Sequence, residues 1–179
     1  MVNRFSTFIT TYLKAVLGCL YLFSFGWLFP RHRYLLYKIR SHFEQEPAAE
    51  LLDVAQECGV GIIVRVVFDE GVLTGKFKAD TRFPSGDFRS VYFAGDRLGR
   101  AVQRAEAIRL DLASTGLTMA QGALKFVLAH PAVSTVIPGI RNVAQAEANC
   151  GASDLPDLAP AVLQRLRRHN WRRAFWYAG

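Results

Sequence analysis

The sequence is poor in cysteine, and it contains no acidic residue before Glu44. Its 3 cysteines, Cys19, Cys58 and Cys150, are odd in number and share no close spacing. This arrangement predicts neither a disulfide framework nor a zinc site, so a reducing, cytoplasmic environment without bound metal is the default expectation. A chain of 179 residues is long enough to bury one hydrophobic core.

Because no acidic residue precedes Glu44, the positive charge of the chain is concentrated near its N-terminus. Residues 1–40 carry +6 of the net charge of +7, which leaves +1 for the rest of the chain. A nucleic-acid-binding surface would therefore have to come from the C-terminal helix and tail. Its candidate residues are Arg165, Arg167, Arg168, Trp171, Arg172, Arg173 and Trp176. Because a basic amphipathic helix is more often a solvated face, we expect no nucleic-acid partner.

Residues 1–42 form an apolar, basic leader that is unlike the rest of the chain. No charge interrupts residues 15–29, and the apolar zone at 12–29 approaches the roughly 20 residues that a membrane helix needs. Arg31 and Arg33 follow directly, as flanking charges on the cytoplasmic side of a membrane would. Three interpretations stay open: a membrane anchor, a cleaved signal peptide, or a segment joined to the domain by a frame change or a fusion.

The composition changes at Glu44, so a domain is expected at residues 43–179. Pro47 stands near the start of a predicted helix, which Gly59 ends. Val60–Val67 follows as a nearly unbroken apolar run, which predicts a strand buried on both faces. A Gly-bearing loop and a long polar and aromatic connection come next.

Three further helices are predicted after that connection or near the C-terminus. Ala101–Leu112 has an amphipathic pattern, and Thr118 with Gln121 forms a capping box for a helix that ends near Ala129. A last helix carries apolar residues over 162–166. Because helices alternate with buried strands, the sequence predicts an α/β fold with parallel strand pairing.

The turn after a second predicted strand, Val133–Ile137, is the most suggestive stretch for function. Pro138–Gly139 ends that strand, because proline lacks an N–H and glycine allows an unusual turn. Asn142 with Gln145 three residues on predicts that a helix begins at once. Free N–H groups at a helix start attract a phosphate, and Arg141 adds a planar cation beside them. An ordinary strand–turn–helix of an α/β fold is the alternative interpretation.

Four groups of residues stand in an order and spacing that is specific when they are taken together. They are Phe43–Pro47, then Phe68–Gly75, then Phe83–Pro84 with Gly86–Asp87, and finally Val136–Gly139 with Gln145 and Asn149. Through them, residues 43–175 resemble the C-terminal half of an aldo-keto reductase. The resemblance implies part of a (β/α)8 TIM barrel, namely its C-terminal strand–helix units, preceded by an unrelated apolar N-terminal segment. It also implies NADP(H), or less often NAD(H), as the cofactor and a small carbonyl compound as the substrate.

The resemblance further implies a set of cofactor-binding residues at the carboxyl ends of two barrel strands, where TIM barrels often hold phosphate. Strand Val60–Val67 would be the seventh of the barrel and Val133–Ile137 the eighth. Phe68, Asp69, Gly71 and Leu73 would line the nicotinamide and pyrophosphate, Gly139 and Arg141 would hold the adenosine phosphate, and Gln145 and Asn149 would meet the adenine end. The chain departs from the family at Val67, where proline is usual.

The residues that carry the family's chemistry are not recognisable in this chain. A tyrosine proton donor with its Lys, Asp and His partners belongs to the N-terminal half of the barrel, which no part of this chain resembles. Tyr34, Tyr37, Lys38 and His42 lack the family's spacing, and Arg40-Ser41-His42 stands where Tyr-Asn-Ile is usual. His130 and His169 lie near predicted helix ends, where a cation offsets the helix dipole. We therefore predict no catalytic residue.

Taken together, these features predict a truncated NAD(P)H-dependent aldo-keto reductase. It would keep the phosphate and adenine side of the cofactor site, lack the catalytic half, and be inactive alone. The alternative is a membrane-anchored α/β binding protein without catalysis, with residues 12–29 as its anchor.

Overall fold

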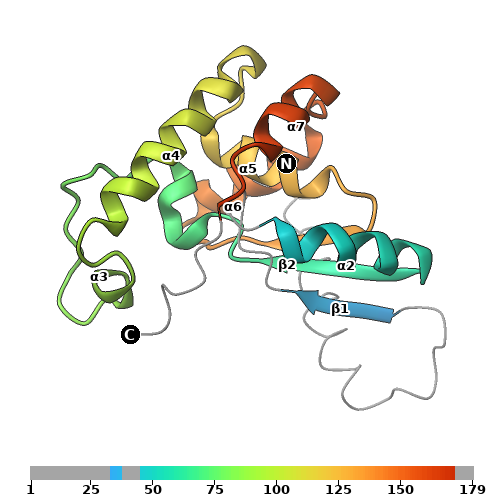
Figure 1. Cartoon of the computed structure of the whole chain (residues 1–179), viewed down its shortest axis with the longest axis horizontal. Helices are drawn as coiled ribbons and strands as arrows, with labels where there is room; N and C mark the ends of the chain where they lie inside the picture. The colour runs from blue at the N-terminus through green and yellow to red at the C-terminus, as the bar shows by residue number, and fades with distance from the viewer. Residues whose placement is uncertain (1–32, 38–44, 172–179) are drawn as a thin grey trace. The chain divides into compact units, whose positions relative to one another are not determined.

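A computed structural model describes residues 33–37 and 45–171 of the chain (Figure 1). Apart from Arg33, the described residues belong to one compact unit, Tyr34–Gly179. The helices and strands are β1 Arg33–Tyr37, α2 Glu46–Glu57, β2 Val60–Arg65, α3 Phe88–Tyr92, α4 Arg97–Leu112, α5 Met119–Leu128, β3 Val133–Ile137, α6 Val143–Gly151 and α7 Pro160–Arg167. Three short 3₁₀ helices are η1 Asp69–Thr74, η2 Ala113–Thr115 and η3 Ala152–Asp154.

The described strands form one sheet in the order β1-β2-β3. β2 and β3 run parallel, with Val64 opposite Val136 and Arg65 opposite Ile137. Helix α2 packs on β2, and α5 packs on β3 (Figure 1). The predicted α/β class with parallel pairing is confirmed for this pair. β1 lies within residues 1–42 and was not expected as a strand, because an apolar leader and a late change in composition conceal it.

Both predicted strands need a correction. β2 ends at Arg65, two residues before the predicted end, because Val66 has a φ of 63° and leaves the extended conformation. Its centre is buried on both faces, as expected for an inner strand. β3 has the predicted bounds, but the prediction that it is buried on both faces is wrong. Ile137 is 40% exposed, because β3 is the last strand of the described sheet.

The helix signals in the sequence have a mixed outcome. The capping box is confirmed: Thr118 Oγ1 accepts the Gln121 N–H at 3.3 Å, and Gln121 Oε1 accepts the Thr118 N–H at 2.9 Å. Helix α4 begins at Arg97, before the predicted start at Ala101. Helix α3 was missed, because its 5 residues are too few for a helical pattern to show in an aromatic segment.

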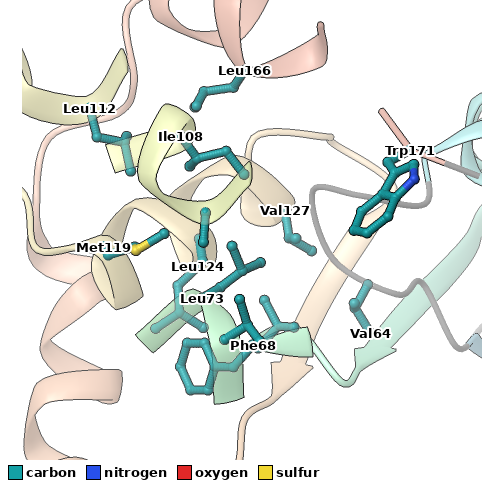
Figure 2. Packing of buried hydrophobic residues seen from close by; sticks show 14 of the residues in the cluster. Val64, Phe68, Leu73, Ile108, Leu112, Met119, Leu124, Val127, Leu166 and Trp171 are labelled. Atoms are coloured by element: carbon teal, nitrogen blue, oxygen red, sulfur yellow. The ribbon is translucent and has the colours of Figure 1, made fainter. Parts of the chain in front are cut away.

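One hydrophobic core joins the sheet to the helices. Figure 2 shows Leu73 from η1, Ile108 from α4 and Leu124 from α5 pointing into a common interior. All three side chains are at most 1% exposed. Trp171, at the end of the described chain, is 8% exposed and lies beneath the guanidinium groups of Arg100 and Arg104, 5.5 and 4.4 Å from its ring. The packing therefore extends to the last described residue.

Polar contacts tie the segments around α7 to the neighbouring helices. Lys125 on α5 is 6% exposed, and its Nζ donates to the Leu155 carbonyl at 2.9 Å and to Asp157 Oδ1 at 2.7 Å. His169 Nε2 lies 2.7 Å from Asp111 Oδ2, which links the end of α7 to the end of α4. His169 therefore has a structural partner, Asp111, in addition to its place near a helix end.

None of the described helices combines the length and the apolar character that a membrane crossing requires. The proposed anchor at residues 12–29 lies outside the described residues, as do Lys38, His42 and the C-terminal residues Arg172, Arg173 and Trp176.

Candidate functional site

Two loops leave the carboxyl ends of the neighbouring parallel strands β2 and β3. The first covers residues 66–76 and includes η1, and the second covers residues 138–142 and leads into α6. Because the strands are parallel, their carboxyl ends lie at one edge of the sheet, where α/β folds bind ligands. These loops carry the eight predicted cofactor-binding residues or lead directly to them.

The second loop forms the predicted helix start. Asn142 Oδ1 accepts the Gln145 N–H at 2.9 Å, and Gln145 Oε1 accepts the Arg141 N–H at 2.9 Å. The Asn142 cap is thus confirmed, and the first N–H groups of α6 have no acceptor within the helix. Arg141 is exposed beside them. The positive end of the helix and the exposed Arg141 guanidinium together suit an anion.

Gly139 does not adopt the left-handed backbone conformation that glycine allows. Its φ lies outside the left-handed region that favours glycine. A Cβ added at this position would meet nothing within 4 Å. The expectation of an unusual glycine turn is therefore wrong, and Pro138 ends β3 by lacking an N–H group. What the loop offers is open space beside an exposed backbone.

The first loop is strained at residues that are not glycine. Val66, Asp69 and Glu70 have φ values of 63°, 49° and 55°. Such conformations cost about 1–3 kcal/mol each and cluster at functional sites. Gly71 follows with a φ of 105°, and a Cβ there would lie 3.0 Å from Cζ of Phe77, so this position does require glycine.

The predicted residues of the first loop are mostly covered. Leu73 is 0% exposed, Asp69 1% and Phe68 9%, whereas Gly71 is half-buried. Phe68 and Leu73 point into the core in Figure 2, so they support the loop from beneath. A ligand at this edge would therefore meet the loop mainly through its less buried backbone, around Gly71.

Asn149 on α6 carries an unusual feature for a half-buried residue. Its Nδ2 is buried and has no hydrogen-bond partner among the described residues. An unpaired buried donor costs about 1–3 kcal/mol, so an acceptor from a bound molecule would be stabilising here. The half-buried Gln145 lies one helical turn before it. The α6 side of the edge thus offers an unused donor, which fits a base-bearing ligand.

A pair that the sequence analysis did not single out as functional lies between the two loops. Arg89 donates from Nε to Asp87 Oδ1 at 2.9 Å and from Nη2 to Asp87 Oδ2 at 2.5 Å. Its guanidinium also stacks over Phe83 and Phe77, 5.0 and 5.8 Å from the ring centres. Asp87 caps α3, so an Asp before a short aromatic run was the available signal.

Electrostatics connect this pair to both loops. The Arg89 hydrogen bonds, with a smaller effect of the Arg141 charge, lower the pKa of Asp87 from 3.8 to about 2. Hydrogen bonding to Asp87, with a smaller effect of Glu70, raises the pKa of Arg89. The charges of Glu70, Arg89, Asp87 and Arg141 therefore alternate from the first loop to the second.

The depressed pKa of Asp87 predicts a specific pH dependence. Because the folded carboxyl has a pKa of about 2 instead of 3.8, its stabilising effect is present above pH 3.8 and is lost as the pH falls toward 2. A carboxyl-carbon NMR titration is expected to give a midpoint near 2. Arg89→Gln should raise that midpoint, and an unchanged midpoint in this variant would contradict the assigned cause.

The described residues contain no group of His, Cys, Asp and Glu that could hold a metal ion.

Comparison with known proteins identifies the fold around the two loops. The model of the Aldo/keto reductase family matches residues 31–170. The chain belongs to the aldo/keto reductase family. The match begins earlier than residue 43, so the family resemblance includes β1 and the segment after it.

Relatives of known sequence agree with this assignment. The chain is 28% identical over 113 residues to "Aldo-keto reductase str7" of Strobilurus tenacellus, which covers 62% of this chain and 34% of that protein. It is 30% identical over 127 residues to "Probable voltage-gated potassium channel subunit beta" of Arabidopsis thaliana, which covers 66% of this chain and 38% of that protein. The chain thus spans little more than a third of each relative.

Solved structures of this family share the fold. Aldo-keto reductase AKR11C1 from Bacillus halodurans, in its holo form, has a TM-score of 0.57 at 20% identity, over 88% of this chain and 49% of that one. The glycerol dehydrogenase AKR11B4 from Gluconobacter oxydans has a TM-score of 0.61 at 19% identity, over 77% and 42%. The predicted partial (β/α)8 barrel is therefore confirmed, and this chain spans about half of it or less.

Proposed function

We propose that this aldo/keto reductase chain forms the phosphate and adenine side of a nicotinamide-cofactor site, with NADP(H) preferred over NAD(H). Carbonyl reduction by hydride transfer is the reaction that this site serves, in a cytoplasmic setting. When bound, the cofactor would supply the hydride. The residues of this chain bind and orient it.

The observation that carries the proposal is the exposed Arg141 beside the capped start of α6. A phosphate there would accept bonds from the helix N–H groups and from two parallel guanidinium donors. Asn149 supports an adenine at the same edge, because its buried Nδ2 lacks a partner among the described residues. NADP(H) carries one phosphate more than NAD(H), on the adenosine ribose, and that phosphate suits Arg141.

The proposal also includes inactivity of the chain alone. Among the side chains that the structure describes, Tyr92 is the one tyrosine. It is 2% exposed within an aromatic cluster. A tyrosine with an ordinary pKa near 10 needs a close cation to serve as a proton donor to a carbonyl. Buried Tyr92 is not placed for that task, so we assign no catalytic residue.

The proposal predicts cofactor selectivity without turnover. The full chain should show no NADPH-dependent reduction of aldehydes above a blank. Residues 43–179, grafted onto the first six strand–helix units of an intact family member, should bind NADPH about 10- to 150-fold more tightly than NADH, as a charge-assisted phosphate contact implies. Fluorescence titration measures both affinities. Equal affinities would contradict the phosphate assignment, and turnover by the full chain would contradict the assigned inactivity.

A further inference from the structure

An aromatic ring covers part of the first loop. Phe77 follows the loop directly, and its side chain is half-buried. The Cζ atom of its ring lies 3.0 Å, and Cε2 3.3 Å, from the point where a Cβ on Gly71 would stand. The ring therefore occupies the space that a side chain at Gly71 would need, and it packs against the backbone of the loop at that point.

Phe77 is itself held by two neighbours. The ring of Phe83 meets it edge to face, with the ring centres 5.2 Å apart. The guanidinium of Arg89 lies over both rings, 5.8 Å from the centre of Phe77 and 5.0 Å from the centre of Phe83. Edge-to-face ring pairs and cations over ring faces are both attractive. We call Phe77, Phe83 and Arg89 the cation–aromatic stack.

Asp87 keeps the guanidinium of Arg89 in this place. The hydrogen bonds from Arg89 Nε to Asp87 Oδ1 and from Arg89 Nη2 to Asp87 Oδ2, 2.9 and 2.5 Å long, fix the plane of the guanidinium. The two side chains are only 18% and 21% exposed, so solvent screens this pair less than it screens an ordinary surface pair. The stack is therefore anchored at its cationic end.

The first loop needs support because its backbone is strained. Three of its residues have positive φ values without being glycine, namely Val66, Asp69 and Glu70. Conformations of this kind persist only where the surrounding structure over-determines them. The hydrophobic core holds the loop through the buried side chains of Val72 and Leu73. Phe77 adds a second point of support at Gly71.

We propose that Phe77 and Arg89 are positioning residues of the candidate site. Their stack holds the backbone around Gly71 in the conformation in which the loop meets a ligand at the carboxyl end of β2. Their role toward a nicotinamide cofactor rests on the proposed function. Both side chains act through the loop, so neither has to touch the cofactor.

Amide hydrogen exchange of the full 179-residue chain, without any cofactor, tests this role. The N–H groups of Gly71, Leu73 and Gly75 donate to carbonyls within the loop at 3.0, 3.0 and 3.1 Å, so their exchange reports opening of the loop. Phe77→Leu keeps apolar bulk but not the ring, and it should speed this exchange about tenfold. Phe77→Tyr keeps the ring and should leave the exchange near the native rate.

Arg89→Gln should speed the same exchange about three- to tenfold, because it removes the cation of the stack. Combined with Phe77→Leu, it should add little to the effect of that change alone, since both changes break one unit. A residue that only fills space near the loop would not show this dependence on Arg89.

Two matched controls make the same chemical changes outside the stack. Phe88→Leu alters an aromatic residue that is 51% exposed and packs on Tyr92, with ring centres 5.4 Å apart. Arg109→Gln removes an arginine that is bonded to Glu106 on α4. Neither control should change the exchange of the three loop amides.

Several outcomes would overturn the inference. Native exchange rates in Phe77→Leu would do so, as would equal acceleration by the control variants or fast exchange of the loop amides in the unchanged chain. Additive effects of Phe77→Leu and Arg89→Gln would mean that the two side chains act separately. Because no cofactor is added, failure of this test leaves the Arg141 selectivity test unaffected, and failure of the proposed NADP(H) site leaves these exchange rates unaffected.

Discussion

Gly122→Ala is expected to lower the free energy of unfolding by about 1–2 kcal/mol. A Cβ at this position would lie 2.4 Å from Cδ1 and 2.8 Å from Cδ2 of Leu112. Leu112 is 2% exposed, so it cannot swing into solvent to make room. Overpacking of this kind costs about 1–3 kcal/mol, and the better helix propensity of alanine offsets at most about 1 kcal/mol.

Urea unfolding of Gly122→Ala checks this prediction, and Gly99→Ala is its matched control. Gly99 is also a helical glycine, but a Cβ there would meet nothing within 4 Å. The control should therefore gain about 0.5–1 kcal/mol from helix propensity alone. The two substitutions are identical in chemistry and are expected to have opposite signs.

A double-mutant cycle then identifies Leu112 as the cause. In a Leu112→Ala background the clashing atoms are gone, so Gly122→Ala should become neutral or stabilising. An unchanged loss in that background would mean that another contact between α4 and α5 is responsible. A stabilising effect of Gly122→Ala in the native background would mean that the two helices adjust more freely than a close-packed core allows.

Sequence-local features were the ones that could be predicted. Asn142 with Gln145, and Thr118 with Gln121, form their caps from residues 3 apart, so the chemistry is complete within one turn. The bounds of β3 were likewise set by its β-branched residues and by Pro138. The barrel class followed from motif order rather than from any single motif.

Features that depend on neighbours in space were missed. The stacking of the Arg89 guanidinium on Phe77 and Phe83 depends on how the connection after η1 folds back. The strained backbone at Val66 has no signal in its side chain, since a β-branched residue normally avoids a positive φ. The exposure of Ile137 follows from its place at a sheet edge, which sequence pattern alone cannot assign.

The candidate site shows the same division. The sequence placed Arg141 beside a helix start, and the structure confirms the cap that creates this start. Leu73 was assigned to the cofactor on resemblance, yet it is 0% exposed. Resemblance identifies positions along the chain, but burial decides whether a side chain or only nearby backbone can reach a ligand. The assigned cofactor contacts stay predictions.

Arg141→Ala is expected to weaken NADPH binding by about 10- to 150-fold and to leave NADH binding nearly unchanged. The loss corresponds to one charge-assisted contact of roughly 1.5–3 kcal/mol. The selectivity arises because the two cofactors differ only by the phosphate on the adenosine ribose. Arg141 is exposed and its backbone N–H is already held by Gln145 Oε1 at 2.9 Å, so the loop should survive the substitution.

The measurement uses the chimera in which residues 43–179 follow the first six strand–helix units of an intact family member, titrated with each cofactor. Arg141→Lys should recover part of the NADPH affinity, because it restores the charge but not the two parallel donors. Arg109→Ala removes an exposed arginine that pairs with Glu106 on α4 and should change neither affinity. Equal losses for both cofactors would assign Arg141 to the pyrophosphate or to the fold. No loss for either would mean that the loop after β3 is a structural turn without a ligand.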